Sequence, residues 1–193
     1  NWVNDGGTFS PGTGTITFNA SLSGTVAGTS SLNFTGDGTV LLATNANRAI
    51  TLSGGITTST ALTGTFRDST AGTTTSTINA QVGTAARVLK EVSGGAAGGI
   101  TSFTNDIFAN TLSVTGPGTM VFSGTLSGTA AGLSSINFIG DGGITIADNK
   151  NITLSGGITN TGAANSVQGN ILLSGTSTIS GQVGTAALRL TTL

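Results

Sequence analysis

The 193-residue chain has no cysteine and no histidine. Without cysteine it can form neither a disulfide nor a thiolate metal site. Because it also lacks histidine, the chain can build no Ser-His or Cys-His nucleophile pair and no His-liganded metal centre. We therefore expect no catalytic residues, no metal and no cofactor.

Charge is almost as scarce. Charged residues make up 7% of the chain, 6 basic and 7 acidic, for a net charge of −1, where an ordinary globular protein has about 25%. No basic patch is present to neutralise phosphates or anionic lipids, which argues against nucleic acid as a partner. The longest apolar run, Val40-Leu41-Leu42-Ala43, is far shorter than the roughly 20 residues of a spanning helix. We expect no membrane insertion by this segment.

The strongest positive feature is an internal duplication. Residues 14–57 are repeated from Gly118, at first with an offset of 104 residues (118 − 14). The phrase QVGTAA starts at Gln81 and again at Gln182, an offset of 101 (182 − 81). A unit of roughly 100 residues that keeps its apolar spacing while its polar residues vary is typical of stacked repeats.

Short apolar pairs at positions i and i+2 recur along both copies. This spacing puts both side chains on one face of a β-strand. Turn phrases such as GDG, SGG and SGT separate the pairs. The pairs are Ile16/Phe18, Leu32/Phe34, Val40/Leu42, Ile50/Leu52, Met120/Phe122, Ile136/Phe138, Ile144/Ile146, Ile152/Leu154 and Ile171/Leu173.

These patterns predict an all-β fold, a right-handed parallel β-helix (β-solenoid) made of two tandem repeat units, residues 1–90 and 91–193. The units should be continuous, because residues 88–110 between them keep burying apolar side chains. A coil of roughly 20 residues gives about five coils per unit. Asn and Thr on the turns should form ladders with their equivalents in the coils above and below. Two β-sandwich domains are the alternative.

The run NTLSVTGPGTMVFSGTLSGTAAGLSSINFIGDGGITIADNKNITLSGGI, followed by STISGQVGTAALRL, resembles the passenger regions of rickettsial surface-antigen autotransporters, in particular the outer membrane protein B type. The first copy carries the same phrases, SSLNFTGDGTVLL and INAQVGTAARVL. The resemblance covers most of the chain. It implies a secreted passenger fragment, displayed on a bacterial surface, with a role in adhesion or in a protective layer. It supplies no catalytic residues.

The few acids allow two interpretations. Asp37 and Asp141 occupy equivalent Gly-Asp-Gly turns, where we expect the carboxylate to accept backbone N–H groups; calcium is the alternative, but it requires six or more oxygens. Asp148 lies in a polar turn that we interpret as a solvated corner, with a carbohydrate contact as the alternative. Arg67 and Asp68 occur only in the first copy, in residues 61–80, which we interpret as a tolerant loop in preference to a binding site.

Four functions compete. The first is an extracellular structural or adhesive surface protein, a non-enzymatic rod on a bacterial surface, whose partner is a host or neighbouring cell surface. The second is a subunit that binds itself and polymerises into a filament or surface layer through open β edges. A polysaccharide-active β-helix enzyme is third, because scattered acids do not form a catalytic pair. Ice binding by residues 72–77 is the fourth and least favoured function.

A localised functional surface should lie where the copies disagree, in residues 61–80 and 88–110, or at the two ends of the solenoid. The last residues alternate apolar and polar side chains like an uncapped strand, which would leave an edge able to pair with another chain. The candidate self-association residues are therefore Trp2, Val3, Leu188, Leu190 and Leu193.

Overall fold

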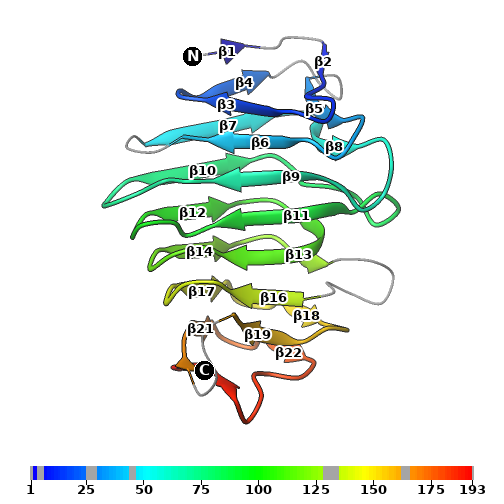
Figure 1. Ribbon diagram of the computed structural model, residues 1–193. Coiled ribbons are helices and arrows are strands. Elements are labelled where there is room, and N and C mark those ends of the chain that lie inside the picture. Colours follow the sequence, from blue (N-terminus) through cyan, green and yellow to red (C-terminus); the bar gives the residue numbers. More distant parts are fainter. Residues whose placement is uncertain are drawn as a thin grey trace.

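A computed structural model describes residues 2–3, 7–24, 30–43, 47–127, 135–161 and 166–192. These residues form β-strands and turns and contain no helix. All of the strand-to-strand pairings are parallel, and successive coils stack from the N-terminus at one end to the C-terminus at the other (Figure 1). The fold prediction is confirmed: the chain is a parallel β-solenoid, and two β-sandwiches are excluded.

The strands fall on three faces. Face 1 is a ladder of eight strands: β1 (Trp2–Val3), β4 (Leu22–Gly24), β7 (Arg48–Leu52), β10 (Thr75–Asn79), β12 (Ile100–Phe103), β14 (Thr119–Phe122), β17 (Gly143–Ile146) and β21 (Asn170–Leu173). Face 2 contains β3 (Thr15–Phe18), β6 (Thr39–Leu42), β9 (Thr63–Asp68), β11 (Leu89–Gly94), β13 (Ile107–Val114), β16 (Ser135–Phe138) and β19 (Ile158–Asn160).

Face 3 is assembled from shorter pieces. It contains β2 (Thr8–Phe9), β5 (Ser31–Phe34), β8 (Gly55–Thr58), the bridging residue Val82, the first residues of β13, and then β15 (Leu126–Ser127), β18 (Asn151–Thr153) and β22 (Thr178–Ser180). A small pair, β20 (Ser166–Val167) with β23 (Leu188–Arg189), lies near the C-terminus. The chain visits the faces in the order 2, 1, 3.

Inward side chains stack in columns along the axis. On face 1, one column is formed by Leu22, Ile50, Ile78, Phe103, Phe122 and Ile146, all at most 1% exposed. Within it the rings of Phe103 and Phe122 are parallel, with centroids 5.3 Å apart. The i, i+2 apolar pairs of the sequence therefore point into a continuous core, and hydrophobic burial holds the coils together.

The coils are longer and more variable than predicted. The step along the chain from Leu22 to its partner Ile50 is well above the predicted coil length, whereas the step from Phe103 to Phe122 is close to it. The predicted coil was therefore too short for most of the molecule, and the predicted number of coils per unit was too high. Most strands stay short, and the turns between them absorb the differences in length.

The two copies are rotated relative to each other by one face. Ile16 lies on face 2, but its repeat equivalent Met120 lies on face 1. Likewise Leu22 lies on face 1 and its equivalent Leu126 on face 3. Between Ile16 and Met120 the chain returns to face 2 four times before it reaches face 1. The repeat unit therefore spans four turns and one further face.

Residues 61–80 are not a loop, which corrects our interpretation. They contain β9 and β10 and contribute buried Phe66 and Ile78 to the core. Asp68 is fully buried at the end of β9, where its carboxylate accepts hydrogen bonds from the hydroxyls of Thr70 (2.6 Å) and Thr101 (2.7 Å). Divergence from the second copy here reflects a polar patch inside the core.

The junction between the copies is regular solenoid. β11 crosses residues 90 and 91 and pairs with β9 on one side and β13 on the other.

Candidate functional site

The equivalent Gly-Asp-Gly turns clamp one coil to the next. Asp37 Oδ1 accepts the N–H of Gly64 (3.3 Å), and Asp141 Oδ1 accepts the N–H of Gly169 (3.1 Å). Both glycines have positive φ, +82° and +89°, and sit against the rings of Phe34 and Phe138. The expected structural role of these acids is confirmed, although the N–H groups come from the following coil and not from the turn itself.

Two further acids do the same at other corners. Asp106 Oδ1 accepts the N–H of Thr125 (2.7 Å), and Asp148 Oδ1 accepts those of Thr176 (2.8 Å) and Asn149 (2.7 Å). The backbone N–H of Thr176, helped by that of Asn149, holds the pKa of Asp148 below its ordinary value. Asp148 is therefore a solvent-facing corner, as predicted, with a defined role in coil stacking.

One acid also forms an ion pair on the surface. Lys90 Nζ lies 2.6 Å from Asp37 Oδ2, and both side chains are about half exposed. The hydrogen bond that Lys90 donates to Asp37 lowers the pKa of Asp37 and raises the pKa of Lys90. Such exposed pairs contribute little to stability.

Asn and Thr side chains link neighbouring coils. Thr57 donates to Asn33 Oδ1 (3.0 Å), and the repeat equivalents Thr159 and Asn137 form the same bond (2.7 Å). Thr104 likewise donates to Asn79 (2.8 Å). Ladders between coils are present as predicted, but they join Asn to Thr instead of equivalent residues, and the repeated pair lies on strands and not on turns.

The QVGTAA phrase builds the same turn twice. The side-chain amides of Gln81 and Gln182 donate to the carbonyl oxygens of Gly83 and Gly184, both at 3.0 Å. The glycines adopt positive φ, +67° and +64°. This repeated phrase is thus architectural.

An open groove of about 270 Å³ lies on the outside of face 2, where the copies disagree. Arg67 and Glu91 bring a guanidinium and a carboxylate to it, from β9 and β11. Hydroxyl groups and an exposed Ile139 complete the lining, which is Thr39, Thr65, Arg67, Glu91, Ser93, Thr115 and Ile139. Hydrogen-bonding groups beside an apolar side chain suit a polar ligand such as a carbohydrate.

Sequence reasoning identified residues 61–80 and 88–110 as divergent but did not join Arg67 and Glu91 into one site. Thr65 lies between Thr39 and Glu91 in the face 2 register, and Arg67 lies beside Ser93. These register partners are separated by a full coil of the chain, so the coil length had to be known first.

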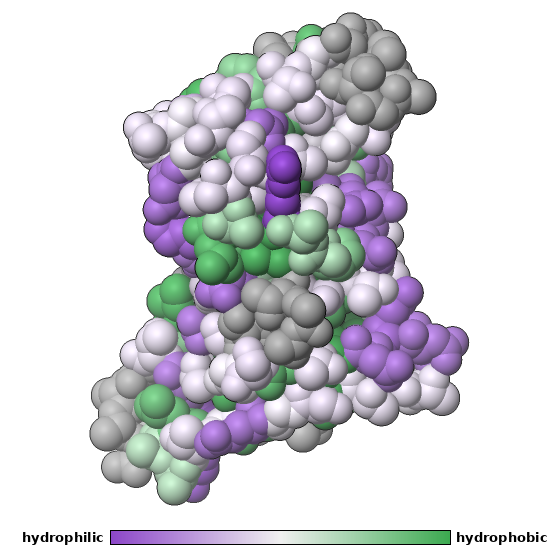
Figure 2. All heavy atoms as spheres, turned by 90° about the vertical axis from the view of Figure 1, so that its right-hand side faces the viewer, coloured by the Kyte–Doolittle hydropathy of each residue, from purple (hydrophilic) through white to green (hydrophobic). Residues whose placement is uncertain are grey.

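The side of the solenoid that carries face 3 is patchy. Figure 2 shows an apolar band at mid-height between groups of hydrophilic residues. Neither apolar nor hydrophilic residues cover the whole side. Across the described residues, the exposed large apolar side chains are dispersed: Val3, Leu62, Ile100, Ile139, Val167, Leu172 and Val183.

The predicted self-association residues lie at opposite ends of the stack (Figure 1). Trp2 and Val3 form β1, which pairs with β4, and Val3 is 58% exposed. At the other end, Leu188 pairs with Ser166 in β20, and Leu190 is packed partly against the core. The C-terminal strand is thus paired on its inner side. Leu193 lies outside the described residues.

No family model, curated protein or solved structure matches the chain. Among the segments that the structure describes, none is a helix long and apolar enough to cross a membrane.

Proposed function

We propose that the chain is an extracellular structural or adhesive protein, a non-enzymatic β-solenoid rod on a bacterial surface. One observation carries the proposal: the residues that the two copies share form the core and the corners. Phe34 and Phe138 fill the interior, while Asp37 and Asp141 clamp the coils. Duplication has preserved an extended shape, as in repeat proteins that act through their surfaces.

The acids support a non-enzymatic role. Four of the seven acidic residues, Asp37, Asp106, Asp141 and Asp148, accept backbone N–H groups of an adjacent coil. Asp68 is buried among hydroxyls. Glycosidase chemistry requires two carboxyl groups facing a substrate across a cleft, and these five acids have structural partners instead.

The face 2 groove supports the adhesive side of the proposal. It combines Arg67 and Glu91 with a row of hydroxyls on a rigid ladder, an arrangement suited to polar groups on a host or neighbouring cell surface. The guanidinium is not repeated in the second copy: a groove at the equivalent position carries Leu172, which stands directly after Ile171 as Arg67 does after Phe66.

Adhesion of cells to beads coated with the purified chain tests this role. We expect binding to host or neighbouring cells, and a several-fold loss with R67A/E91A. The matched control is R87A, which removes an exposed arginine from a turn away from the groove. Beads that retain no cells would overturn the adhesive role. Cleavage of polysaccharides by the chain with sustained turnover would overturn the proposal and favour the enzyme.

A further inference from the structure

The face 2 groove holds two charged side chains that no hydrogen bond or ion pair engages within the described part of the chain. Among the acids that the structure describes, Glu91 alone accepts no hydrogen bond and forms no ion pair. Lys90, its neighbour in sequence, pairs with Asp37 instead (2.6 Å). The exposed guanidinium of Arg67 likewise makes no hydrogen bond or ion pair to any described residue. Both groups can therefore bind a ligand.

Three hydroxyl groups of the groove also lack a hydrogen bond within the described residues. Elsewhere on the solenoid Thr and Asn side chains bond between coils, as Thr57 does to Asn33. The hydroxyls of Thr39, Thr65 and Ser93 make no such bond to any described residue. They stand on three neighbouring strands, β6, β9 and β11. The groove therefore presents donors and acceptors whose positions are fixed by the ladder.

The register places the two charges within reach of one ligand. Arg67 pairs with Ser93 and Glu91 with Thr65, so Arg67 and Glu91 are diagonal neighbours on adjacent strands. With rungs about 4.8 Å apart and a rise of about 3.3 Å per residue, their Cα atoms are separated by about 8 Å. A sugar ring with its substituents spans this distance. One substituent can then meet the guanidinium while another meets the carboxylate.

The duplication contains the same groove without its two charges. A second groove, of about 350 Å³, lies on face 1, the face to which the rotation between copies moves the equivalent residues. Leu172 there takes the place of Arg67. Thr192 takes the place of Glu91, since each follows the first residue of QVGTAA by the same interval (192 − 182 and 91 − 81). The ladder therefore does not require either charge, which points to a role of both in binding.

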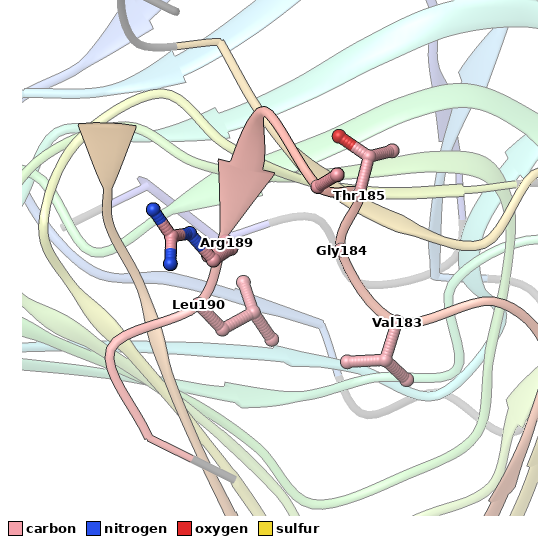
Figure 3. Close-up of a pocket in the computed structure, with 6 residues that line it drawn as sticks. Val183, Gly184, Thr185, Arg189 and Leu190 are labelled. Carbon is pink, nitrogen blue, oxygen red and sulfur yellow. The ribbon is translucent and has the colours of Figure 1, made fainter. Parts of the chain in front are cut away.

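A larger hollow, of about 450 Å³, lies beside the second QVGTAA turn and has a different character. In Figure 3 the side chains of Val183 and Leu190 face each other across it, and Arg189 points away. This hollow offers a ligand apolar side chains and no charged group directed into it. Selection of a charged ligand therefore belongs to the face 2 groove.

We propose that the face 2 groove binds a carbohydrate that carries a carboxylate group, and that Arg67 binds this carboxylate. The inference names the ligand class for the adhesive role proposed above and rests on that role. A guanidinium forms two parallel hydrogen bonds to a carboxylate, which fixes its orientation. The hydroxyls of Thr39, Thr65 and Ser93 hydrogen-bond to the hydroxyl groups of the sugar.

Glu91 restricts the ligand to one with an isolated negative charge. Its carboxylate accepts hydrogen bonds from hydroxyl or amide groups of the sugar, but it repels a second anionic group. Arg67 and Glu91 are the charged residues of the lining, so their charges cancel and a sulfated polyanion gains little there. The exposed side chain of Ile139 adds an apolar surface for the C–H groups of a sugar.

NMR titration of the 193-residue chain tests the ligand class. The probes are sialyllactose and cellobiouronic acid, each compared with its methyl ester, which has the same sugar framework without the negative charge. Dextran sulfate is the polyanion. R67L and E91T each adopt the residue of the second copy, and circular dichroism confirms that they fold. R87L is the matched control, because Arg87 is exposed in a turn away from the groove and its repeat equivalent is Leu188.

We expect at least one of the two acids to bind, and its ester to bind about tenfold more weakly or worse, because a charge-assisted hydrogen bond is lost. R67L should lose a similar factor, and R87L should bind like the wild type. E91T should gain affinity for dextran sulfate, and no gain would overturn the role of Glu91. Binding of neither acid, equal binding of acid and ester, or unchanged affinity of R67L would overturn the ligand class.

The bead assay separates this inference from the role on which it rests. Cells retained on beads by a chain that binds neither acid would overturn the ligand class alone. Beads that retain no cells would overturn the adhesive role, whatever the probes show.

Discussion

At the scale of single residues, the corners depend on glycines that hold a left-handed conformation against an aromatic ring. A Cβ on Gly64 or Gly169 would come within 2.3 Å of the ring of Phe34 or Phe138. Positive φ adds backbone strain to this overlap. These two requirements explain why the glycines recur in both copies, although the surrounding polar residues differ.

We expect G64A and G169A each to lower the free energy of unfolding by about 2 to 4 kcal/mol, from strain and overpacking together. G14A is the control, since a Cβ there meets nothing within 4 Å. Urea denaturation measures all three. Equal stability of G64A and G14A would show that the corner does not pack as described.

The corner acids predict a dependence of stability on acid pH. The folded-state pKa of Asp148 is below the ordinary value of 3.8, because the N–H groups of Thr176 and Asn149 favour its charged form. A depressed pKa stabilises the fold above the unfolded-state value, and this contribution is lost as pH falls through the folded-state value.

D148N should therefore be less stable than the wild type at pH 6, and the difference should shrink as pH falls below about 4. Denaturation at a series of pH values measures it. A difference that stays constant down to pH 2 would contradict the assignment of the hydrogen bonds to the ionised carboxylate.

Sequence reasoning identified Asp37 and Asp141 as backbone acceptors, but it placed their N–H donors in the same turn and not in the following coil. Gly64 is 27 residues from Asp37, a separation that no local turn pattern reveals.

At the scale of elements, the duplicated QVGTAA turn contains an internal control for coil stacking. Val82 lies between two coils and is fully buried, and Val183 has the same local sequence but is 38% exposed. We expect V82A to cost about 2 kcal/mol of unfolding free energy, and V183A less than half of that. Urea denaturation measures both. Equal losses would mean that local turn structure, and not stacking between coils, sets the contribution of this valine to the free energy of unfolding.

Strand positions were predictable because alternation of buried and exposed residues is a local property. Leu32 and Phe34, for example, stand two apart and are both buried. Residues 61–80 were misread as a loop because the Asp68 carboxylate lies inside the core, where it accepts hydrogen bonds from the hydroxyls of Thr70 and Thr101. A buried carboxylate among hydroxyls resembles a solvated loop in sequence.

At the scale of the whole molecule, the one-face rotation between copies sets which surfaces point the same way. It arises because a unit of roughly 100 residues does not contain a whole number of turns. The duplication was evident from the sequence, but the rotation depends on the summed lengths of many turns, and these vary from coil to coil. The face 2 groove was hidden for the same reason.

The absence of cysteine allows the stacking of the two copies to be tested with engineered pairs. Ser102 and Val121 are register partners on face 1, from the coils where the copies meet. Ser93 lies on face 2. Neighbouring rungs are about 4.8 Å apart, within the Cα separation of a disulfide.

Oxidation of S102C/V121C, followed by electrophoresis and mass spectrometry, measures this register directly. We predict rapid formation of an intramolecular disulfide in S102C/V121C and none in S93C/V121C. A bond in the second variant but not in the first would place Val121 on face 2 and contradict the rotated solenoid.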